Sequence, residues 1–474
     1  TELACDPDNL SSVIKKLLRS LARLAPGHKA GHGRALKHDP SIHKGSRVGI
    51  DRRMVSSAAV RTIEGLQHAG FKAFVVGGGV RDLMLGLRPK DFDVATDATP
   101  EEVQRIFRRA RLIGRRFRIV HVMFGPETIE VSTFRALAHE SQETDAHGRV
   151  LRDNTFGEQH EDASRRDFTI NALYYDPLSD TVLDYHHGVK DIQARCLRMI
   201  GHPEQRYRED PVRMLRVLRF QAKLGFHVDD QTLAPIRSLA ALLENVPEAR
   251  LFDEIVKMLC SGAALRALEG LTAYGLHRHC LPMLEMVLDP SSKGPDGEAA
   301  LDFVRLSLAK TDERVGQGKP ISIGFLFASL LWPAIRFEWR RLESGGVKPV
   351  PALHEAIEEV VEVQNAGYSV QKRILSDARE LWLMQPRFEK RGGGAALRLL
   401  ENPRFRAGFD FLLLRVEAGE LDPDLGQWWI AFESTDSHDE RLALIADLGR
   451  AANGSSGPRR RRRHSRRTEA ASAP

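Results

Sequence analysis

The sequence predicts an α+β fold, in which a small domain with a mixed β-sheet is followed by domains that are all helical. Two patterns indicate this division. Between residues 54 and 185, short apolar runs typical of strands alternate with segments of helical periodicity. Beyond residue 190, apolar residues recur at three- and four-residue spacing in segment after segment, and strand patterns are scarce. The 474 residues leave room for about three domains.

The mixed region is expected to begin near Met54 with a helix that Gly70 ends, because apolar residues recur there at helical spacing. A buried strand over 71–76 follows, then a glycine turn with a short helix over 80–85. A second strand is expected over 91–94.

Further elements follow from capping residues and periodicity. Residues 99–102 carry a helix start, with a capping threonine, a proline and two acids. Residues 120–124 and 128–134 alternate like paired strands around a Gly-Pro turn. Helices are expected over 212–224, 251–259, 300–308, 321–331, 352–363 and 405–414, and the last helix is expected to end near residue 448.

These patterns, with composition, divide the chain into five parts. Residues 24–53 are rich in Gly, His and Lys without an apolar period, and 451–458 have the composition of a linker. The expected parts are a flexible basic extension over 1–53, a mixed-sheet head over 54–185, a helical neck over 186–262, a helical body over 263–448 and a disordered arginine-rich tail over 449–474.

The positive charge of the chain lies at its two ends. The net charge is +6, yet residues 1–53 carry 11 Lys and Arg against 5 Asp and Glu. Residues 459–474 carry seven arginines and one glutamate, which leaves 54–458 with a net charge of −6. A mildly acidic middle with two basic ends indicates a polyanionic partner.

Cysteine usage and hydropathy exclude several classes of protein. The four cysteines lie far apart and form no C-x-x-C pair, which argues against a disulfide framework or a structural zinc site and favours a reducing compartment. No apolar run approaches the roughly 18 residues that a membrane span needs. We therefore expect a cytoplasmic protein without a membrane span, and we expect it to be a monomer.

Three glycines, Gly77, Gly78 and Gly79, stand between an expected strand and an expected helix. Glycines let the backbone approach a bound group closely, and N–H groups at a helix start favour phosphate. The pattern matches neither Gly-x-Gly-x-x-Gly nor a P-loop, which excludes dinucleotide-binding and P-loop folds. On its own, such a turn is more often simply a tight turn.

Asp91 and Asp93 are two positions apart on an expected strand, so both carboxylates would project from one face while Phe92 enters the core. Two ionised carboxylates close together repel, and a divalent cation removes that cost. Mg²⁺ held there could organise the phosphates of a nucleoside triphosphate and activate a hydroxyl nucleophile. An exposed Asp-x-Asp on an edge strand is the alternative.

Glu130 is a candidate for a third acid. Ile129 and Val131 make one face of the expected strand apolar and leave Glu130 on the other face. A two-metal site for nucleotidyl transfer needs a third carboxylate on a neighbouring strand. Taken alone, however, a glutamate on a strand is normally a surface residue.

Residues 165–172, Arg-Arg-Asp-Phe-Thr-Ile-Asn-Ala, place charged groups at the entry to an apolar segment. Arg166 can fork onto triphosphate oxygens, and Asn171 can hydrogen-bond to a ribose or a base. Asp167 can bind a metal or hold an arginine in place. A solvated helix start is the alternative.

Asp210, Arg213 and Arg216 recur at every third position of an expected helix and so share a face. A carboxylate and a guanidinium on a rigid helix can present a hydrogen-bonding edge to a base. An exposed helix with ion pairs three positions apart is the alternative.

Together these motifs resemble the class II polymerase-β-like nucleotidyltransferases, which include tRNA CCA-adding enzymes and bacterial poly(A) polymerases. The resemblance is strong over 54–260 and rests mostly on helical character beyond it. It implies a small catalytic head, a helical neck that reads the base and helical RNA-binding domains. It rests on Gly77-Gly78-x-Val80-Arg81-Asp82, Asp91-x-Asp93, Arg165-Arg166-Asp167-Phe168-Thr169-x-Asn171-Ala172 and Glu209-Asp210-x-x-Arg213.

Two features resemble the poly(A) polymerase branch. Residues 112–122 are similar to that branch and lack the Gly-Thr-containing loop that is usual in CCA-adding enzymes. The basic extension and the terminal arginine cluster also resemble the polyadenylating enzymes, since mobile cations can hold varied RNA ends through phosphate contacts. The arginines expected to bind RNA are Arg459, Arg460, Arg461, Arg462, Arg463, Arg466 and Arg467.

The resemblance implies template-independent addition of AMP from ATP to RNA 3′-hydroxyl ends, as in mRNA polyadenylation that promotes RNA decay, with the RNA-degradation machinery as an expected partner. Asp91 and Asp93 would bind two Mg²⁺ ions, with Glu130 or Asp167 as the third carboxylate. The residues that would contact the nucleotide are Gly77, Gly78, Gly79, Arg81, Arg166, Asn171, Asp210, Arg213 and Arg216.

Two other functions remain open at this point. One is a CCA-adding enzyme, which would incorporate CTP as well as ATP. The other is a non-catalytic RNA-binding adaptor with an inactive transferase fold. The clustered acids Asp91, Asp93 and Glu130 argue against the adaptor, since an inactive site has no need of them.

Overall fold

The computed structural model describes residues 39–114, 118–137, 155–281, 284–288, 297–367 and 370–454. The chain divides into two compact units, Thr1–Pro40 and Ser41–Pro474. Nearly all of the first unit lies outside the described residues, and so do the seven C-terminal arginines. All helices and strands named below belong to the second unit.

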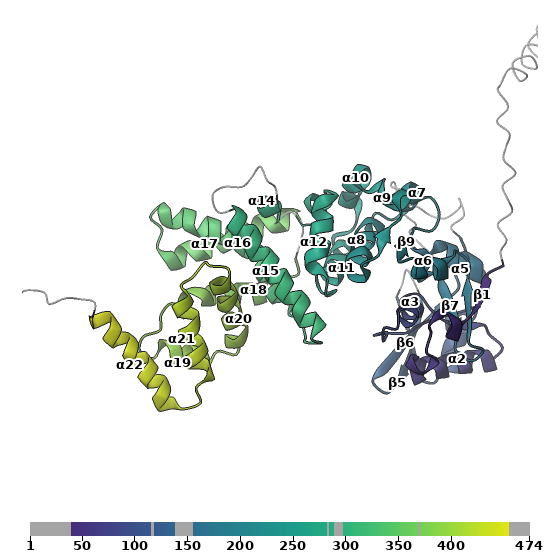
Figure 1. Ribbon diagram of the computed structural model, residues 1–474, viewed down its shortest axis with the longest axis horizontal. Coiled ribbons are helices and arrows are strands. Elements are labelled where there is room, and N and C mark those ends of the chain that lie inside the picture. Colours follow the sequence, from purple (N-terminus) through teal and green to yellow (C-terminus); the bar gives the residue numbers. More distant parts are fainter. Residues whose placement is uncertain are drawn as a thin grey trace, which may run out of the picture. The chain divides into compact units, whose positions relative to one another are not determined.

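An eight-stranded mixed sheet is the centre of the head (Figure 1), with the strand order β1-β8-β7-β2-β3-β6-β5-β4. Neighbouring strands are antiparallel except β3 and β6, whose parallel pairing places Asp93 opposite Glu130. The strands are β1 Ser41–Lys44, β2 Ala73–Val76, β3 Asp93–Thr96, β4 Ala110–Ile113, β5 Ile119–Phe124, β6 Glu127–Thr133, β7 Leu173–Asp176 and β8 Thr181–Asp184.

Helices with sequence-encoded caps connect these strands. The side chain of Ser56 caps α2. Thr99 and Glu102 form a capping box at the start of α4, where the sequence predicts a helix start. α2 packs on β2, β3 and β6, and so covers the strands that carry Asp93 and Glu130. The helical elements of the head are η1 Gly45–Val48, η2 Arg52–Met54, α2 Ser57–His68, α3 Gly78–Met84, α4 Pro100–Ile106, α5 Gln159–Arg165, η3 Thr169–Asn171 and α6 Gly188–Gln193.

The sequence predicts that the head begins near Met54. In the structure it begins earlier, with β1. β1 pairs with β8 at the edge of the sheet, and the N–H of Gly45 donates to the carbonyl of Asp180. Residues 41–53, expected within the flexible extension, therefore belong to the head. The only large apolar residue of β1, Ile42, is exposed, so no apolar alternation marked this strand. Backbone pairing holds it in place.

Beyond the head, the regular elements of the described residues are helices, as predicted, apart from one short parallel strand pair, β9 Cys196–Leu197 and β10 His227–Val228. The helical elements are α7 Pro203–Glu209, α8 Val212–Leu224, α9 Asp230–Leu233, α10 Ile236–Leu239, η4 Ala240–Asn245, α11 Glu248–Leu259, α12 Ala264–Ala273, α13 His277–Cys280, α14 Glu285–Leu288, α15 Gly297–Gly316, α16 Ile323–Ser344, α17 Pro349–Gly367, α18 Lys372–Phe388, α19 Ala395–Leu400, α20 Phe405–Glu417, α21 Pro423–Ser434 and α22 His438–Gly454.

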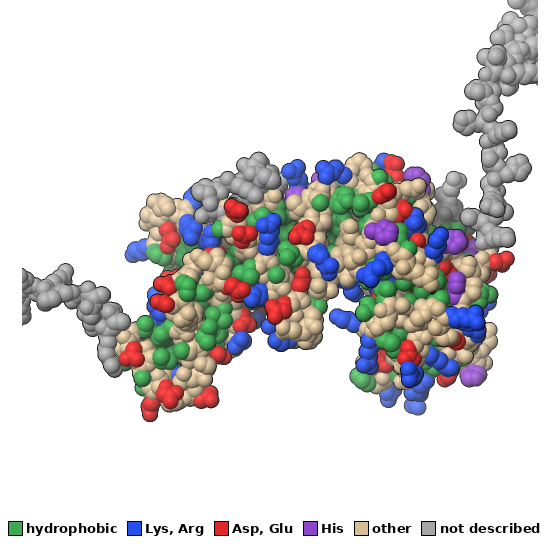
Figure 2. All heavy atoms as spheres, viewed as in Figure 1, with side chains coloured by type: hydrophobic (Ala, Val, Ile, Leu, Met, Phe, Trp, Pro, Cys, Tyr) green, Lys and Arg blue, Asp and Glu red, His purple; other side chains and the backbone are tan. Residues whose placement is uncertain are grey.

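These elements confirm the predicted α+β class. One cluster of buried apolar residues includes Val94 of the sheet, Leu215 of α8 and Trp332 of α16, so the core continues from head to body. Among the described residues, no helix is both long and apolar enough to cross a membrane. Lys and Arg side chains are mixed with Asp and Glu over the face that Figure 2 shows.

Candidate active site

The turn between β2 and α3 has a backbone conformation that favours glycine. Gly77 has φ of +70°, and a Cβ atom there would lie 3.3 Å from Nη1 of Arg166. Gly79 differs, because a Cβ atom there would meet Val75 and Phe92 only at an ordinary contact distance of 3.5 Å. The requirement for glycine is therefore strongest at Gly77, where the backbone turns against an arginine.

Two carboxylates face each other on neighbouring parallel strands. Asp93 opens β3 and is the register partner of Glu130 on β6, while Phe92 is buried, as predicted. Asp91 lies before β3 begins, so strand alternation does not explain its position. Its charge nevertheless acts on Asp93. The structure thus brings Asp91, Asp93 and Glu130 into one region of the head.

The pKa of Asp93 is raised to about 6. Loss of water around the carboxyl is the largest cause, even though part of the residue is exposed, and the charge of Glu130 adds to it. The charge of Asp91 also raises the pKa, whereas Arg166 lowers it. Repulsion among carboxylates therefore exceeds the attraction of the nearby arginine, and the region favours a cation.

Arg166 is a fixed cation beside the glycine turn and the carboxylates. Its Nη2 lies 3.1 Å from Oδ2 of Asp162, and its Nε donates to the hydroxyl of Tyr174 at 3.2 Å. Burial opposes its charge, but Tyr174 and Asp162 outweigh that effect and raise the pKa of Arg166. The side chain therefore stays charged and held in one orientation.

Arg81 and Asn171 belong to a buried hydrogen-bond network. Nη1 of Arg81 donates to Oδ1 of Asn171 at 2.7 Å, and its Nη2 pairs with Asp82 at 2.6 Å. Nδ2 of Asn171 donates to Oδ1 of Asp167 at 3.1 Å. Since only 3% of Arg81 is exposed, it orients Asn171 instead of presenting an open guanidinium to a substrate.

Asp167 ties the head to α8. Its Oδ2 lies 2.6 Å from Nη2 of Arg216, and its Oδ1 accepts from the N–H of Phe168 at 2.8 Å. Burial opposes ionisation, but Arg216 and these hydrogen bonds outweigh it and lower the pKa of Asp167 to about 2. Both carboxylate oxygens have partners within the protein. The acid that faces Asp93 across the strands is Glu130.

Glu254 of α11 extends this ion pair, and the sequence analysis did not identify it. Only 4% of Glu254 is exposed, and its carboxylate lies 2.5 Å from Nε of Arg219 and 3.8 Å from Nη1 of Arg216. The sequence feature that could have identified Glu254 is its position as an acid among the apolar residues of 251–259. A buried carboxylate there needs arginine partners from another helix.

The prediction that Asp210 and Arg213 lie on one helix is wrong. Asp210 is the C-terminal cap of α7, and α8 begins only at Val212. Oδ2 of Asp210 accepts from Nη2 of Arg250 at 2.9 Å, whereas Arg213 pairs with Glu209. Oδ1 of Asp210 is buried without a hydrogen-bond partner among the described residues, so a donor that reached it would recover the free energy of an unmade hydrogen bond.

The donor set fits Mg²⁺, which takes oxygen ligands and commonly binds through one or two carboxylates together with substrate phosphates. Within the described parts of the chain, no group of three or more His, Cys, Asp and Glu side chains could hold a metal ion. Asp91 and Asp93 therefore fit a cation that a bound nucleotide helps to hold. His121, which the sequence analysis also missed, lies 3.5 Å from Glu130.

Three family models match this chain. They are Poly A polymerase head domain over 73–198, Probable RNA and SrmB- binding site of polymerase A over 225–288, and Polymerase A arginine-rich C-terminus over 345–468. Poly(A) polymerase I of Salmonella typhimurium is 41% identical over 429 residues, which cover 88% of this chain and 90% of that protein. The predicted resemblance is therefore confirmed.

CCA-adding enzymes share a smaller part of the sequence. The enzyme of Lactobacillus helveticus is 37% identical over 201 residues, which cover 42% of this chain and 49% of that protein. A solved structure described as "Structure of tRNA-processing enzyme complex 3" has a TM-score of 0.54 at 21% identity and covers 82% of this chain and 99% of that chain. At that identity, the likeness shows a common fold.

Proposed function

The chain belongs to the poly(A) polymerase family, and on that premise we propose which of its residues carry out the reaction. It is a template-independent polynucleotide adenylyltransferase that adds AMP from ATP to RNA ends. A CCA-adding activity is less favoured, because that similarity extends over 42% of the chain, whereas the similarity to poly(A) polymerase I extends over 88%. We assign catalysis to Asp91, Asp93 and Glu130.

The observation that carries this assignment is the pairing of Asp93 with Glu130 across β3 and β6, with the raised pKa of Asp93. Asp91 and Asp93 would hold two Mg²⁺ ions, with Glu130 on the side of the RNA 3′-hydroxyl. When bound, the ions would acidify that hydroxyl and neutralise charge on the leaving pyrophosphate. Asp167, saturated by Arg216, would act as a positioning residue.

The triphosphate would lie between the glycine turn and Arg166. The backbone at Gly77 and Gly78 can approach phosphate oxygens closely, and the two Nη groups of Arg166 can donate to them. Arg81 would act through Asn171, which it holds at 2.7 Å. This arrangement turns the α-phosphate toward the carboxylates and thus favours attack by the 3′-hydroxyl.

The neck would read adenine. Oδ1 of Asp210 is the buried acceptor without a partner, and an exocyclic amine such as that of adenine is a matching donor. Arg213 would complete the hydrogen-bonding edge that faces the base. Arg250 would hold Asp210 in place through its hydrogen bond of 2.9 Å. Arg216 would position the neck against the head through Asp167.

The RNA would also bind to the basic C-terminal tail, whose arginines lie outside the described residues. Contacts to phosphates do not depend on sequence, so they suit an enzyme that elongates varied RNA ends. A role in mRNA polyadenylation that promotes decay, a cytoplasmic location, a monomeric state and contact with the RNA-degradation machinery remain predictions.

The test compares Asp91→Ala and Asp93→Ala with the wild type in the product ladder made from a generic RNA with ATP or CTP. Both variants should lose AMP transfer by at least about 10³-fold while their circular dichroism spectra stay unchanged. Glu127→Gln, on the same strand as Glu130, is the matched control and should retain activity. Near-normal activity of Asp93→Ala would refute the assignment, and incorporation of CTP would favour a CCA-adding enzyme.

A further inference from the structure

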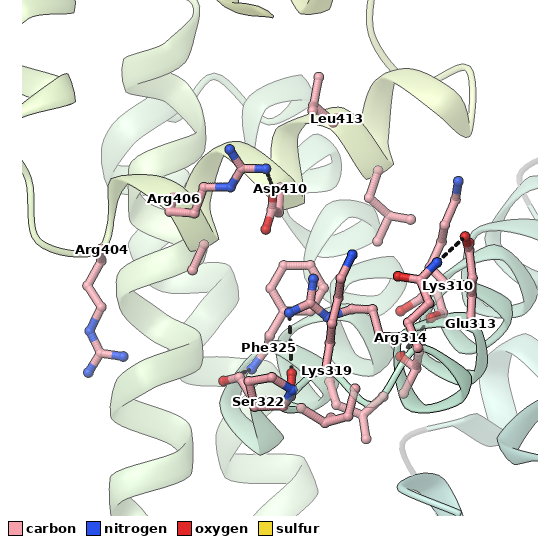
Figure 3. Close-up of a pocket in the computed structure, with 18 of the residues that line it drawn as sticks. Lys310, Glu313, Arg314, Lys319, Ser322, Phe325, Arg404, Arg406, Asp410 and Leu413 are labelled. Carbon is pink, nitrogen blue, oxygen red and sulfur yellow. Dashed lines mark hydrogen bonds and ion pairs between the residues drawn. The ribbon is translucent and has the colours of Figure 1, made fainter. Parts of the chain in front are cut away.

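We propose that the helical body contains a binding pocket for one nucleotide of the single-stranded RNA, separate from the carboxylates of the head. This proposal rests on the action of the chain on RNA. The pocket has a volume of about 760 Å³ and lies between the end of α15, the start of α16 and α20 (Figure 3). Cavities of roughly 300–1,000 Å³ commonly accept small organic ligands.

One part of the pocket lining is apolar and can receive a base. Phe325 and Leu326 of α16 line it together with Leu413 and Leu414 of α20. The ring of Phe325 is partly exposed and packs edge-on against Phe411, with ring centroids 5.8 Å apart. An aromatic ring supported from behind is the usual platform on which a single-stranded base stacks.

The rim of the pocket carries cations without acidic partners. Nζ of Lys319 has no hydrogen-bond or ion-pair partner within the described residues, and Arg314 donates only to the carbonyl of Pro320 at 3.3 Å. Other cations of the lining are neutralised, since Lys310 pairs with Glu417 at 2.9 Å. The cations that remain available to a ligand are therefore Lys319 and Arg314.

Acids on the rim do not cancel this charge. Asp410 pairs with Arg406 at 3.1 Å, whereas Glu313 accepts from the neutral amide of Gln317 at 3.0 Å and keeps its charge, so the two cations Lys319 and Arg314 still exceed this acid by one. Two long helices, α16 and α20, also begin at the pocket, with Ser322 and Arg404 at their N-terminal caps. The N-terminus of each helix adds a partial positive charge. The rim therefore favours an anion.

A buried hydroxyl supplies independent evidence for a ligand. Ser307 lines the pocket with only 2% of its surface exposed, and its Oγ has no hydrogen-bond partner among the described residues. A buried hydroxyl without a partner costs free energy that a ligand acceptor would recover. Ribose hydroxyls and phosphate oxygens are such acceptors.

An apolar wall with an aromatic ring, two available cations and an unpaired hydroxyl together match a nucleoside phosphate. The base would stack on Phe325, while the phosphate would lie near Lys319 and Arg314. The terminal segments 1–53 and 459–474 are poor alternatives, because both are basic and the rim would repel them. The structure therefore favours an RNA nucleotide as the occupant.

The test is fluorescence anisotropy of labelled oligo(A) with the full chain. Lys319→Ala should weaken binding roughly 3- to 10-fold and reduce the slope of log K against log salt by about 0.7. Ala407→Trp, which fills the pocket without a change of charge, should weaken binding roughly 5-fold or more and leave the slope unchanged. Lys372→Ala removes an exposed lysine on α18 and is the matched control, with binding within about 2-fold of the wild type.

A second readout does not depend on the fold of a variant. Oligo(A) that carries 8-azidoadenosine should crosslink to a peptide that contains Phe325 in the wild type, and excess unlabelled oligo(A) should suppress that crosslink. Neither measurement requires AMP transfer, so this proposal can fail while the catalytic assignment stands. Unchanged binding by both Lys319→Ala and Ala407→Trp would overturn it, and so would crosslinks that form only elsewhere in the chain.

Discussion

Replacement of Asp93 by asparagine should stabilise the metal-free protein at pH 8 while it abolishes catalysis. The pKa of Asp93 is raised from 3.8 to about 6 by loss of water and by the charges of Glu130 and Asp91. A carboxyl whose pKa is raised by folding disfavours the folded state once it must ionise. The cost is therefore absent below pH 3.8, grows between pH 3.8 and 6, and is complete above pH 6.

The size of the expected gain in stability follows from the pKa shift of Asp93. One pKa unit corresponds to about 1.4 kcal/mol, so a rise of about two units sets an upper limit of about 3 kcal/mol at pH 8. Part of the Asp93 side chain is exposed. Since solvent screens its charge, we expect a gain of about 1 kcal/mol in the free energy of unfolding.

Urea unfolding in EDTA, followed by circular dichroism at pH 8 and pH 4, measures this gain. Asp93→Asn should be more stable than the wild type at pH 8, and the difference should shrink at pH 4. Glu127→Gln, on the same sheet, should have the stability of the wild type at both pH 8 and pH 4. A variant that is no more stable at pH 8, or a gain that persists at pH 4, would refute the account of crowded carboxylates.

Three further predictions follow from single contacts or segments. Arg216→Met should lower the free energy of unfolding by about 3 kcal/mol at pH 7, because it leaves Asp167 buried without its ion pair. The lost stability should diminish as pH falls from 3.8 toward 2, because Asp167 becomes protonated there and its depressed pKa no longer stabilises the fold. Urea unfolding at pH 7 and near pH 2 checks this. Gly77→Ala should raise the KM for ATP several-fold, since its Cβ would press on Arg166; wild-type ATP kinetics would contradict this. Deletion of 454–474 should weaken RNA binding and reduce its salt dependence without a change in ATP affinity; an unchanged salt slope in filter binding would rule out the tail as an RNA contact.

Local patterns predicted four of the strands, β2, β3, β5 and β6, and helices such as α8, α16 and α20. The capping box at Thr99, the paired strands β5 and β6, and the long helices all have signals that lie within a few residues of each other. The break between Asp210 and α8 also had such a signal, since Pro211 has no N–H to continue a helix. The three-residue spacing of Asp210, Arg213 and Arg216 indicated one helix, but that proline separates Asp210 from α8.

Contacts between residues far apart in the sequence could not be predicted from local patterns. Asp167 and Arg216 are 49 positions apart, and nothing local shows that they pair. For the same reason the sequence could not show which of Glu130 and Asp167 lies opposite Asp93. Parallel pairing of β3 with β6 aligns Glu130 with Asp93, whereas a tertiary ion pair occupies Asp167. β1 was missed because its stability comes from pairing at the sheet edge.

The most direct measurement counts bound divalent cations by electron paramagnetic resonance, with Mn²⁺ as the probe and α,β-methylene-ATP present. The account predicts two tightly bound ions per chain in the wild type, and loss of tight binding in Asp91→Asn and Asp93→Asn. Glu127→Gln should bind both ions. Undiminished binding of both ions by Asp93→Asn would contradict the central claim that these carboxylates hold the catalytic metals.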